Sequence, residues 1–205
     1  MLPRVLLLDL DDTILDDSGS RDRSLLEVCE AAARRTSLDP ARVLEEVDRA
    51  RAAFWSQPEN DRRRLDMADA YGEIFTGALA ALGVDDRELG AELGALIERR
   101  RSETIEPLDG AIDTLHELRR RGIVLGLITN GGRAGQRAKI ERFALAAHFA
   151  YIGVEGEVGH GKPHRIAYER APDALGVAAS ACWMVGDNLE WDVAGAQAVG
   201  IRGIW

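Results

Sequence analysis

Cysteine and lysine are both scarce in this sequence of 205 residues, and the scarcity of cysteine limits what the protein can be. The chain has two cysteines, Cys29 and Cys182, which are too few and too far apart for a disulfide framework. We interpret both as buried free thiols, which is typical of a protein in the reducing cytoplasm. A small secreted domain held together by disulfides is therefore excluded.

Long apolar runs and an excess of positive charge are also missing. No apolar stretch approaches the length of a membrane span, and the first apolar run, of four residues, is too short for a signal peptide. The formal net charge of −9 repels nucleic acid and anionic membrane surfaces, so we predict neither as a partner. The 46% of hydrophobic residues is ample for one packed core and a second small lobe. We expect a monomer or a small homo-oligomer.

Only two of the 26 basic residues are lysines, Lys139 and Lys162. A lysine in a chain that uses arginine almost everywhere else indicates a position that needs an ammonium group. We apply this reasoning to Lys162. Lys139, within the segment QRAKIERF, is interpreted as a residue without such a role.

A short apolar strand followed by crowded carboxylates lies near the start of the chain. Residues 5–8 have no polar break, which is typical of a buried strand of a parallel sheet. Asp9, Asp11 and Asp12 follow within four positions, and Thr13 comes next. These carboxylates repel one another, and a hard divalent cation such as Mg²⁺ would offset the repulsion. Since ligands bind at the carboxyl ends of strands in open α/β sheets, we expect a metal-dependent site here.

Helical patterns dominate the next part of the chain. Residues 15–20, LDDSGS, are expected to form a turn-rich exit from the strand. Four stretches with apolar residues at helical spacing follow, and Asp39 before a proline indicates the start of the second. Asp85 and Glu88 indicate a capping box at the start of the fourth. The pattern predicts a small four-helix bundle over residues 16–104.

After residue 107 the pattern changes to strands that alternate with helices. A helix over 165–175 is expected to kink or break at Pro172, and a last helix is expected over 190–199. Further buried strands are predicted at four places, namely 123–128, 149–154, 182–185 and from 201 onward.

Alternating strands and helices predict βαβ units and a parallel sheet with helices on both faces. The fold class we expect is α/β, a Rossmann-like parallel sheet core with an inserted α-helical cap domain. Residues 1–15 and 105–205 would form the core, and residues 16–104 would form the cap.

Polar groups recur where the predicted strands end, and parallel strands bring these ends to one edge of the sheet. The groups are Thr129, Asn130 and Gly131 after the second strand, Gly161-Lys162-Pro163 after the third, and Asp187, Asn188 and Asp192 after the fourth. Together they offer carboxylates for a cation, a hydroxyl and backbone N–H groups for an anion, and one ammonium. Such a set describes phosphoryl transfer through an aspartyl-phosphate.

The sequence resembles the haloacid dehalogenase (HAD) superfamily, in the phosphatase branch with a helical cap after the first motif. The resemblance covers nearly the whole chain and rests on four motifs in the family's order: DLDDT at 9–13, TNG at 129–131, GKP at 161–163 and GDNLEWD at 186–192. One such motif alone is a weak signal, but four at predicted strand ends are specific. Relatives usually continue past the residue that matches Trp205, so we expect a short end to the sheet.

The resemblance implies a phosphatase mechanism centred on the first motif. Asp9 is the implied nucleophile that attacks phosphorus. Asp11 is the implied general acid that protonates the leaving alcohol and then the base that activates water. The resemblance also implies Mg²⁺ held by the Asp9 side chain, the Asp11 backbone carbonyl and Asp187.

The remaining motifs are implied to bind the phosphoryl group. Thr129 and the amides of Asn130 and Gly131 would hold its oxygens, and Lys162 would neutralise charge between nucleophile and phosphate. Asp192 would orient Lys162 or metal-bound water. We expect supporting roles for Thr13 and Asn188.

The resulting prediction is a cytoplasmic, Mg²⁺-dependent phosphatase that hydrolyses a small soluble phosphomonoester. A haloacid dehalogenase on the same fold is disfavoured because that branch lacks an acid at the position of Asp11. A sugar phosphomutase is disfavoured because its first motif typically has Gly where this chain has Asp12. A non-catalytic phosphate-binding module is disfavoured because the acid, metal and lysine set is complete. A receiver-like module is disfavoured because receivers are much shorter and lack a helical insertion after the first strand. Nucleotides, sugar phosphates and phosphoglycolate all remain open as substrates.

Overall fold

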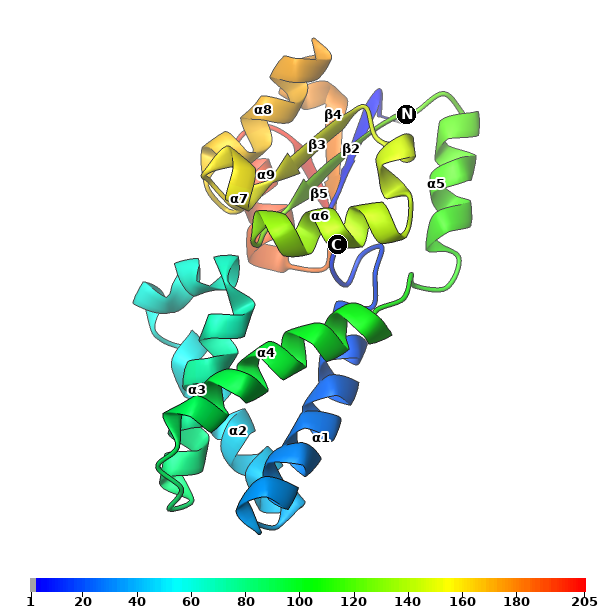
Figure 1. Ribbon diagram of the computed structural model, residues 1–205. Helices are drawn as coiled ribbons and strands as arrows, with labels where there is room; N and C mark the ends of the chain where they lie inside the picture. Colours follow the sequence, from blue (N-terminus) through cyan, green and yellow to red (C-terminus); the bar gives the residue numbers. More distant parts are fainter. Residues whose placement is uncertain (1–2) are drawn as a thin grey trace. The chain divides into compact units, whose positions relative to one another are not determined.

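A computed structural model describes residues 3–205 and contains a five-stranded parallel sheet with the order β3–β2–β1–β4–β5 (Figure 1). The central strand is β1 (Val5–Leu8), whose four apolar residues are all buried. Its last residue, Leu8, pairs with Leu127 and Val185 on the two neighbouring strands. The carboxyl ends of the three central strands therefore meet at one edge. The other strands are β2 (Val124–Thr129), β3 (Tyr151–Val154), β4 (Cys182–Val185) and β5 (Arg202–Ile204).

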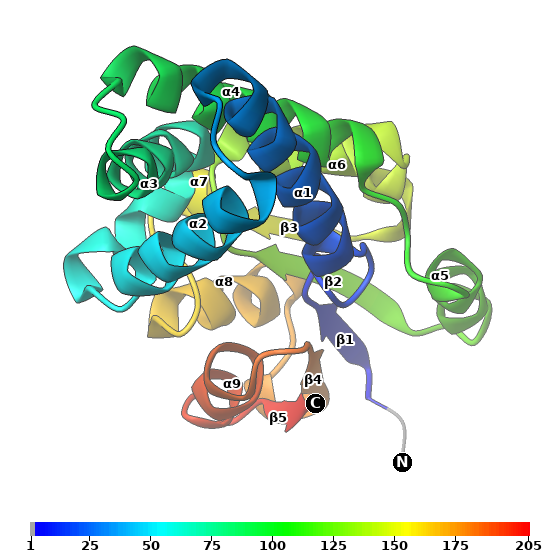
Figure 2. The same ribbon diagram turned by 90° about the horizontal axis from the view of Figure 1, so that it is seen from below.

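Helices cover both faces of this sheet. Figure 2 shows α8 and α9 on one face and α5 and α6 on the other. Leu7 of β1 belongs to the apolar cluster that includes Tyr168 and Ala196 of α8 and α9, and Leu6 and Leu8 alternate to the opposite face. The helical segments are α5 (Ala111–Arg120), α6 (Arg133–Arg142), η2 (Leu145–His148), α7 (Glu155–Val158), α8 (Arg165–Leu175), η3 (Ala179–Ala181), η4 (Leu189–Ala194) and α9 (Gly195–Gln197).

The chain divides into two compact units, and the second is entirely helical. The sheet unit runs to Asp16 and resumes at Glu106, and Asp17–Ile105 forms the other unit, which we call the cap. The expected α/β fold with an inserted helical cap is confirmed. The cap consists of α1 (Asp17–Thr36), α2 (Pro40–Trp55), η1 (Pro58–Leu65), α3 (Met67–Ala81) and α4 (Arg87–Thr104). None of the helices within residues 3–205 is long and apolar enough to cross a membrane.

Two expectations about helix ends were wrong, and one was right. Helix α1 begins at Asp17, inside the expected turn, because the first turn of a helix tolerates polar residues and glycine. Asp86 caps α4 by accepting a hydrogen bond from Leu89 N at 2.8 Å, so Asp85 and Glu88 form no capping box. The N-cap role of Asp39 is confirmed, since its side chain accepts from Ala41 N.

The two later helices lie where they were expected and differ from the expectations in detail. Helix α8 continues through Pro172 without a break, and burial of Ala171 and Pro172 offsets the hydrogen bond that proline cannot donate. The helix expected over 190–199 is present over 189–197, where it begins as a π-helical segment, η4, and continues directly into the short α9. Such wide turns are often found at functional sites, and this one carries the buried Asp192.

The cap has its own apolar core, and its last two helices approach backbone to backbone. A Cβ on Gly94 of α4 would lie 2.3 Å from Ala68 O and 2.4 Å from Gly72 N of α3. Only glycine permits this approach, so any side chain at residue 94 would force the two helices apart.

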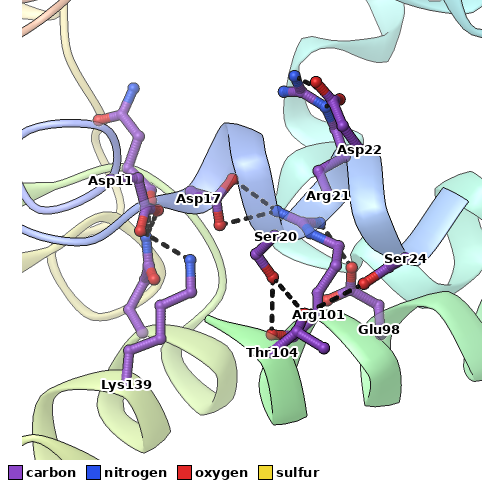
Figure 3. Close-up of polar contacts among 12 residues, drawn as sticks. Asp11, Asp17, Ser20, Arg21, Asp22, Ser24, Glu98, Arg101, Thr104 and Lys139 are labelled. Atoms are coloured by element: carbon purple, nitrogen blue, oxygen red, sulfur yellow. Dashed lines mark hydrogen bonds and ion pairs between the residues drawn. The ribbon is translucent and has the colours of Figure 1, made fainter. Parts of the chain in front are cut away.

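A network of polar contacts ties the first turn of α1 to the last turn of α4 (Figure 3). Arg101 donates to both carboxylate oxygens of Asp17 at 3.0 and 2.8 Å, and the two side chains are only 11% and 13% exposed. Ser20 Oγ donates to Arg101 O and lies 2.9 Å from Thr104 Oγ1. Just outside the cap, Asp16 N donates to Glu106 O at 2.9 Å. The chain therefore enters and leaves the cap through adjacent, hydrogen-bonded segments.

We expect the Asp17→Asn variant to be less stable by about 1.5–3 kcal/mol, the range for a hydrogen bond to a charged group. The change keeps the shape of the side chain but leaves the largely buried Arg101 guanidinium with less compensating charge. Urea unfolding measures the difference. Asp22→Asn is the matched control on the same helix, because Asp22 is 65% exposed and pairs only with surface charge. Equal unfolding midpoints for Asp17→Asn and the wild type would contradict this role of the pair.

Candidate active site

A buried ammonium group between two buried carboxylates lies at the carboxyl edge of the sheet. Lys162 Nζ donates to Asp9 Oδ1 at 2.5 Å and to Asp192 Oδ1 at 2.6 Å. Asp9 directly follows β1, Asp192 belongs to η4 after β4, and Lys162 precedes α8. All three residues are at most 7% exposed. Burial of charge is costly without a partner, so this pairing is what allows three ionisable groups to share the interior.

Burial and the neighbouring charges shift the pKa values of Asp9 and Lys162. It raises the pKa of Asp9 to about 7, because the nearby Asp192 and Asp11 add to the desolvation and Lys162 only partly opposes it. For Lys162, burial alone would lower the pKa, but the attraction of Asp9 and Asp192 outweighs it and the pKa rises. Lys162 therefore stays an ammonium, whereas burial brings the pKa of Asp9 close to neutral pH.

A third carboxylate, that of Asp187, joins this pair of acids. Oxygen atoms of Asp9, Asp187 and Asp192 all lie within 4.8 Å of one another. Burial and the nearby Asp192 raise the pKa of Asp187. One ammonium thus faces three carboxylates, and a hard divalent cation matches both the charge and the oxygen donors of this group. These residues could hold such a cation.

The carboxylate of Asp11 does not join this cluster. Lys139 Nζ donates to Asp11 Oδ1 at 2.7 Å, and Gln136 Nε2 donates to Asp11 Oδ2 at 2.8 Å. The sequence resemblance implied that Asp11 binds metal only through its backbone carbonyl, which leaves the carboxylate available for other work. Lys139, which was interpreted from the sequence as a residue without a special role, pairs through its ammonium with this predicted acid.

The segment that follows β2 holds the backbone of Lys162 in place through the side chain of Asn130. Asn130 Nδ2 donates to Lys162 O, and Lys162 N donates to Asn130 Oδ1, both at 2.7 Å. Thr129 is 2% exposed, and its hydroxyl accepts from Gln136 Nε2 at 2.8 Å. The side chain of Asn130 therefore positions the lysine, a contact that the sequence prediction, which used only the Asn130 amide, did not contain.

The backbone amide of Gly131 already has an acceptor inside the protein. Gly131 N donates to Glu155 Oε2 at 3.0 Å, and Glu155 is 7% exposed. A Cβ on Gly161 would lie 2.5–2.8 Å from the Glu155 carboxylate, so glycine at 161 makes room for this acid. The expected role of the Gly131 amide in holding phosphoryl oxygens stays a prediction.

Two supporting residues have different local roles. Asn188 Oδ1 accepts from Glu190 N at 3.0 Å and Trp191 N at 2.9 Å, so it caps η4 and fixes where Asp192 lies. Thr13 Oγ1 is buried and has no hydrogen-bond partner.

The sequence analysis missed Gln136, Lys139 and Glu155. Gln136 and Lys139 lie three positions apart in α6 and so share one face of that helix. The scarcity of lysine was a usable signal for Lys139. Nothing in the sequence distinguished Glu155 from the many surface acids, because its burial depends on how it packs against Gly161 and on Gly131, which lies 24 positions earlier in the chain.

We expect Asp9→Asn to stabilise the metal-free protein above neutral pH. An unfolded Asp titrates near pH 4 and the folded Asp9 near pH 7, so between these values only the folded state holds the proton. Stability of the metal-free wild type should therefore fall as the pH rises through this window, and the Asn variant should lack that loss. Urea unfolding in EDTA at about pH 8 and about pH 5 measures the gap, which should shrink toward the lower pH.

The exposed Asp109→Asn is the control for this experiment and should follow the wild type at both pH values. A stability gap for Asp9→Asn that widens toward low pH would contradict the raised pKa of Asp9.

Comparison with known proteins gives one consistent family. A family model described as haloacid dehalogenase-like hydrolase matches residues 3–200. Phosphoserine phosphatase of Thermus thermophilus is 35% identical, over 98% of this chain and 88% of its own. N-acylneuraminate-9-phosphatase of Mus musculus is 31% identical, over 98% of this chain and 82% of its own. Among solved structures, the magnesium-bound HAD-hydrolase YfnB of Bacillus subtilis has a TM-score of 0.74 at 23% identity, covering 98% of this chain and 85% of that one. The chain belongs to the haloacid dehalogenase-like hydrolases.

Proposed function

We propose that this protein is a Mg²⁺-dependent phosphatase that hydrolyses a small phosphomonoester through an aspartyl-phosphate on Asp9. The observation that carries the proposal is the buried Lys162 ammonium between Asp9 and Asp192, with Asp187 beside them. A carboxylate that attacks a phosphate dianion meets repulsion, and a lysine together with a cation offsets it. The curated relatives, which are phosphatases, support the same reaction class.

In the first step a carboxylate oxygen of Asp9 attacks phosphorus, and the bond from phosphorus to the leaving alcohol breaks. Lys162 stays paired with Asp9 and offsets the negative charge that gathers there, and Thr129 donates to a phosphoryl oxygen. Asp11 gives its proton to the leaving oxygen. In the second step water attacks the aspartyl-phosphate, Asp11 takes the proton of that water, and phosphate leaves with Asp9 restored.

The cation would be held by Asp9, the Asp11 backbone carbonyl and Asp187, with Asp192 close by. When bound it supplies positive charge to the phosphoryl oxygens and lowers the repulsion between them and Asp9. A magnesium-bound relative of the same fold supports Mg²⁺ as its identity.

The substrate we propose is a small phosphomonoester that carries its own polar groups, since the relatives named above act on phosphoserine and on a phosphorylated acylneuraminate. Both cysteines are buried free thiols, which supports a cytoplasmic location. Monomer or small homo-oligomer stays the prediction for the assembly.

The reaction is tested by phosphate release from 4-nitrophenyl phosphate with and without Mg²⁺. We expect activity that requires Mg²⁺ and that falls by at least about a thousandfold in Asp9→Asn, as removal of a nucleophile does in other hydrolases. The control is Asp109→Asn, the same chemical change at an exposed turn, which should keep full activity. Activity that survives in purified Asp9→Asn would overturn the assignment of the nucleophile.

Cation binding is tested without activity, by thermal unfolding. We expect Mg²⁺ to raise the Tm, because a ligand that binds only the folded state stabilises it. The rise should be larger at about pH 8 than at about pH 6, since the proton on Asp9 competes with the cation below its pKa of about 7. Asp187→Asn should lose most of the rise, whereas Glu190→Gln, an exposed acid nearby in sequence, should keep it. Equal rises in all three proteins would contradict the proposed cation site.

A further inference from the structure

Two side chains from one face of α6 hold both carboxylate oxygens of Asp11. Lys139 Nζ lies 2.7 Å from Oδ1, and Gln136 Nε2 lies 2.8 Å from Oδ2; Figure 3 shows the lysine contact. The Gln136 amide nitrogen also lies 2.8 Å from Thr129 Oγ1 and 2.5 Å from Asn130 O. Helix α6 therefore links the carboxylate of Asp11 directly to the end of β2.

Stability does not account for the lysine in this pair. The side chains of Lys139 and Asp11 are 19% and 26% exposed, and a partly exposed ion pair contributes about 0–1 kcal/mol. The neighbouring Arg137 shows how an arginine binds a carboxylate. Two of its nitrogens donate to both oxygens of Glu157, at 2.8 and 2.6 Å, on the surface. An arginine at 139 would take both oxygens of Asp11 in the same manner and displace Gln136. The lysine takes one oxygen and leaves the other to Gln136.

We propose that Lys139 is a positioning residue for the phosphatase reaction, which together with Gln136 holds Asp11 in the orientation for proton transfer. The inference rests on the proposed function, because it gives Asp11 the role of acid and base. The ammonium and the amide fix the plane of the carboxylate and each uses one lone pair of an oxygen. The second lone pair of an Asp11 oxygen then carries the proton to the leaving oxygen, and later accepts one from water, in an orientation that is already set. Gln136 extends the same constraint to Thr129, so the acid and the phosphoryl-binding hydroxyl are held by one helix.

This role has a kinetic signature that a purely structural role lacks. A poor leaving group such as phenolate depends on a proton from Asp11 to depart, whereas 4-nitrophenolate departs without one. Loss of the positioning contact should therefore lower kcat/KM for phenyl phosphate and spare kcat/KM for 4-nitrophenyl phosphate. The attack of water needs Asp11 with either substrate, so kcat for 4-nitrophenyl phosphate should fall, with KM falling in proportion.

The experiment compares the wild type, Lys139→Met and the control Arg137→Met on both aryl phosphates with Mg²⁺. Methionine keeps the length of the lysine stem, and Arg137→Met removes a cation from the same helix that pairs with Glu157 instead. For Lys139→Met we expect kcat/KM to fall about tenfold or more with phenyl phosphate and to stay within about threefold with 4-nitrophenyl phosphate. Arg137→Met should behave like the wild type with both substrates. A thermal melt of each variant checks that the fold is retained.

The outcomes separate this inference from the function on which it rests. Equal losses of kcat/KM with both substrates, or no loss with either, in the presence of an active wild type overturn the positioning role and leave the phosphatase intact. A wild type that releases phosphate from neither substrate overturns the proposed function itself, and the positioning role falls with it. A selective loss in Arg137→Met as well would assign the effect to the charge of α6 and not to Lys139.

Discussion

The site depends on one buried cation, the ammonium of Lys162, and on the two buried carboxylates that it joins. Asp9, Asp192 and Lys162 come from three different parts of the chain, and none of them could be buried alone without a large desolvation cost. Their mutual attraction fixes where β1, η4 and the segment before α8 lie relative to one another. Asn130 completes the arrangement by holding the backbone of Lys162 with two hydrogen bonds. The edge of the sheet is therefore organised around charge as much as around apolar packing.

Charge also explains why the backbone is irregular at this edge. Gly186 is required because a Cβ there would lie 2.2 Å from Asp192 Cγ, so the strand end and the acid can approach only through glycine. The π-helical turn of η4 carries Asp192, and Asn188 caps it. Each of these features helps to place the Asp192 carboxylate near the Lys162 ammonium. An edge of a sheet without buried charges would not need such an irregular backbone.

The fold and the central residues were predictable from the sequence for physical reasons. The unbroken apolar run at 5–8 predicts a central strand, and parallel strands bring their carboxyl ends to one edge whatever the loops do. Contacts made by residues distant in sequence were not predictable. The burial of Glu155 and the reach of Gln136 to Asp11 depend on three-dimensional packing, and short-range rules say nothing about them. Pro172 misled for a related reason, because its burial in α8 outweighs the local rule against proline in helices.

The adjacent entry and exit of the cap have a consequence for how such proteins diversify. Asp16 and Glu106 are joined by a backbone hydrogen bond, and within the cap the side chains of Asp17 and Arg101 form an ion pair. A segment whose two ends lie together can be lengthened, exchanged or removed with little change to the strands that flank it, as is general for domain insertions. The central strand and its acids can then stay constant while a different bundle is grafted between the same two residues. In this sense the cap is a replaceable module, and the joint at Asp16 and Glu106 is the place at which a designer would cut.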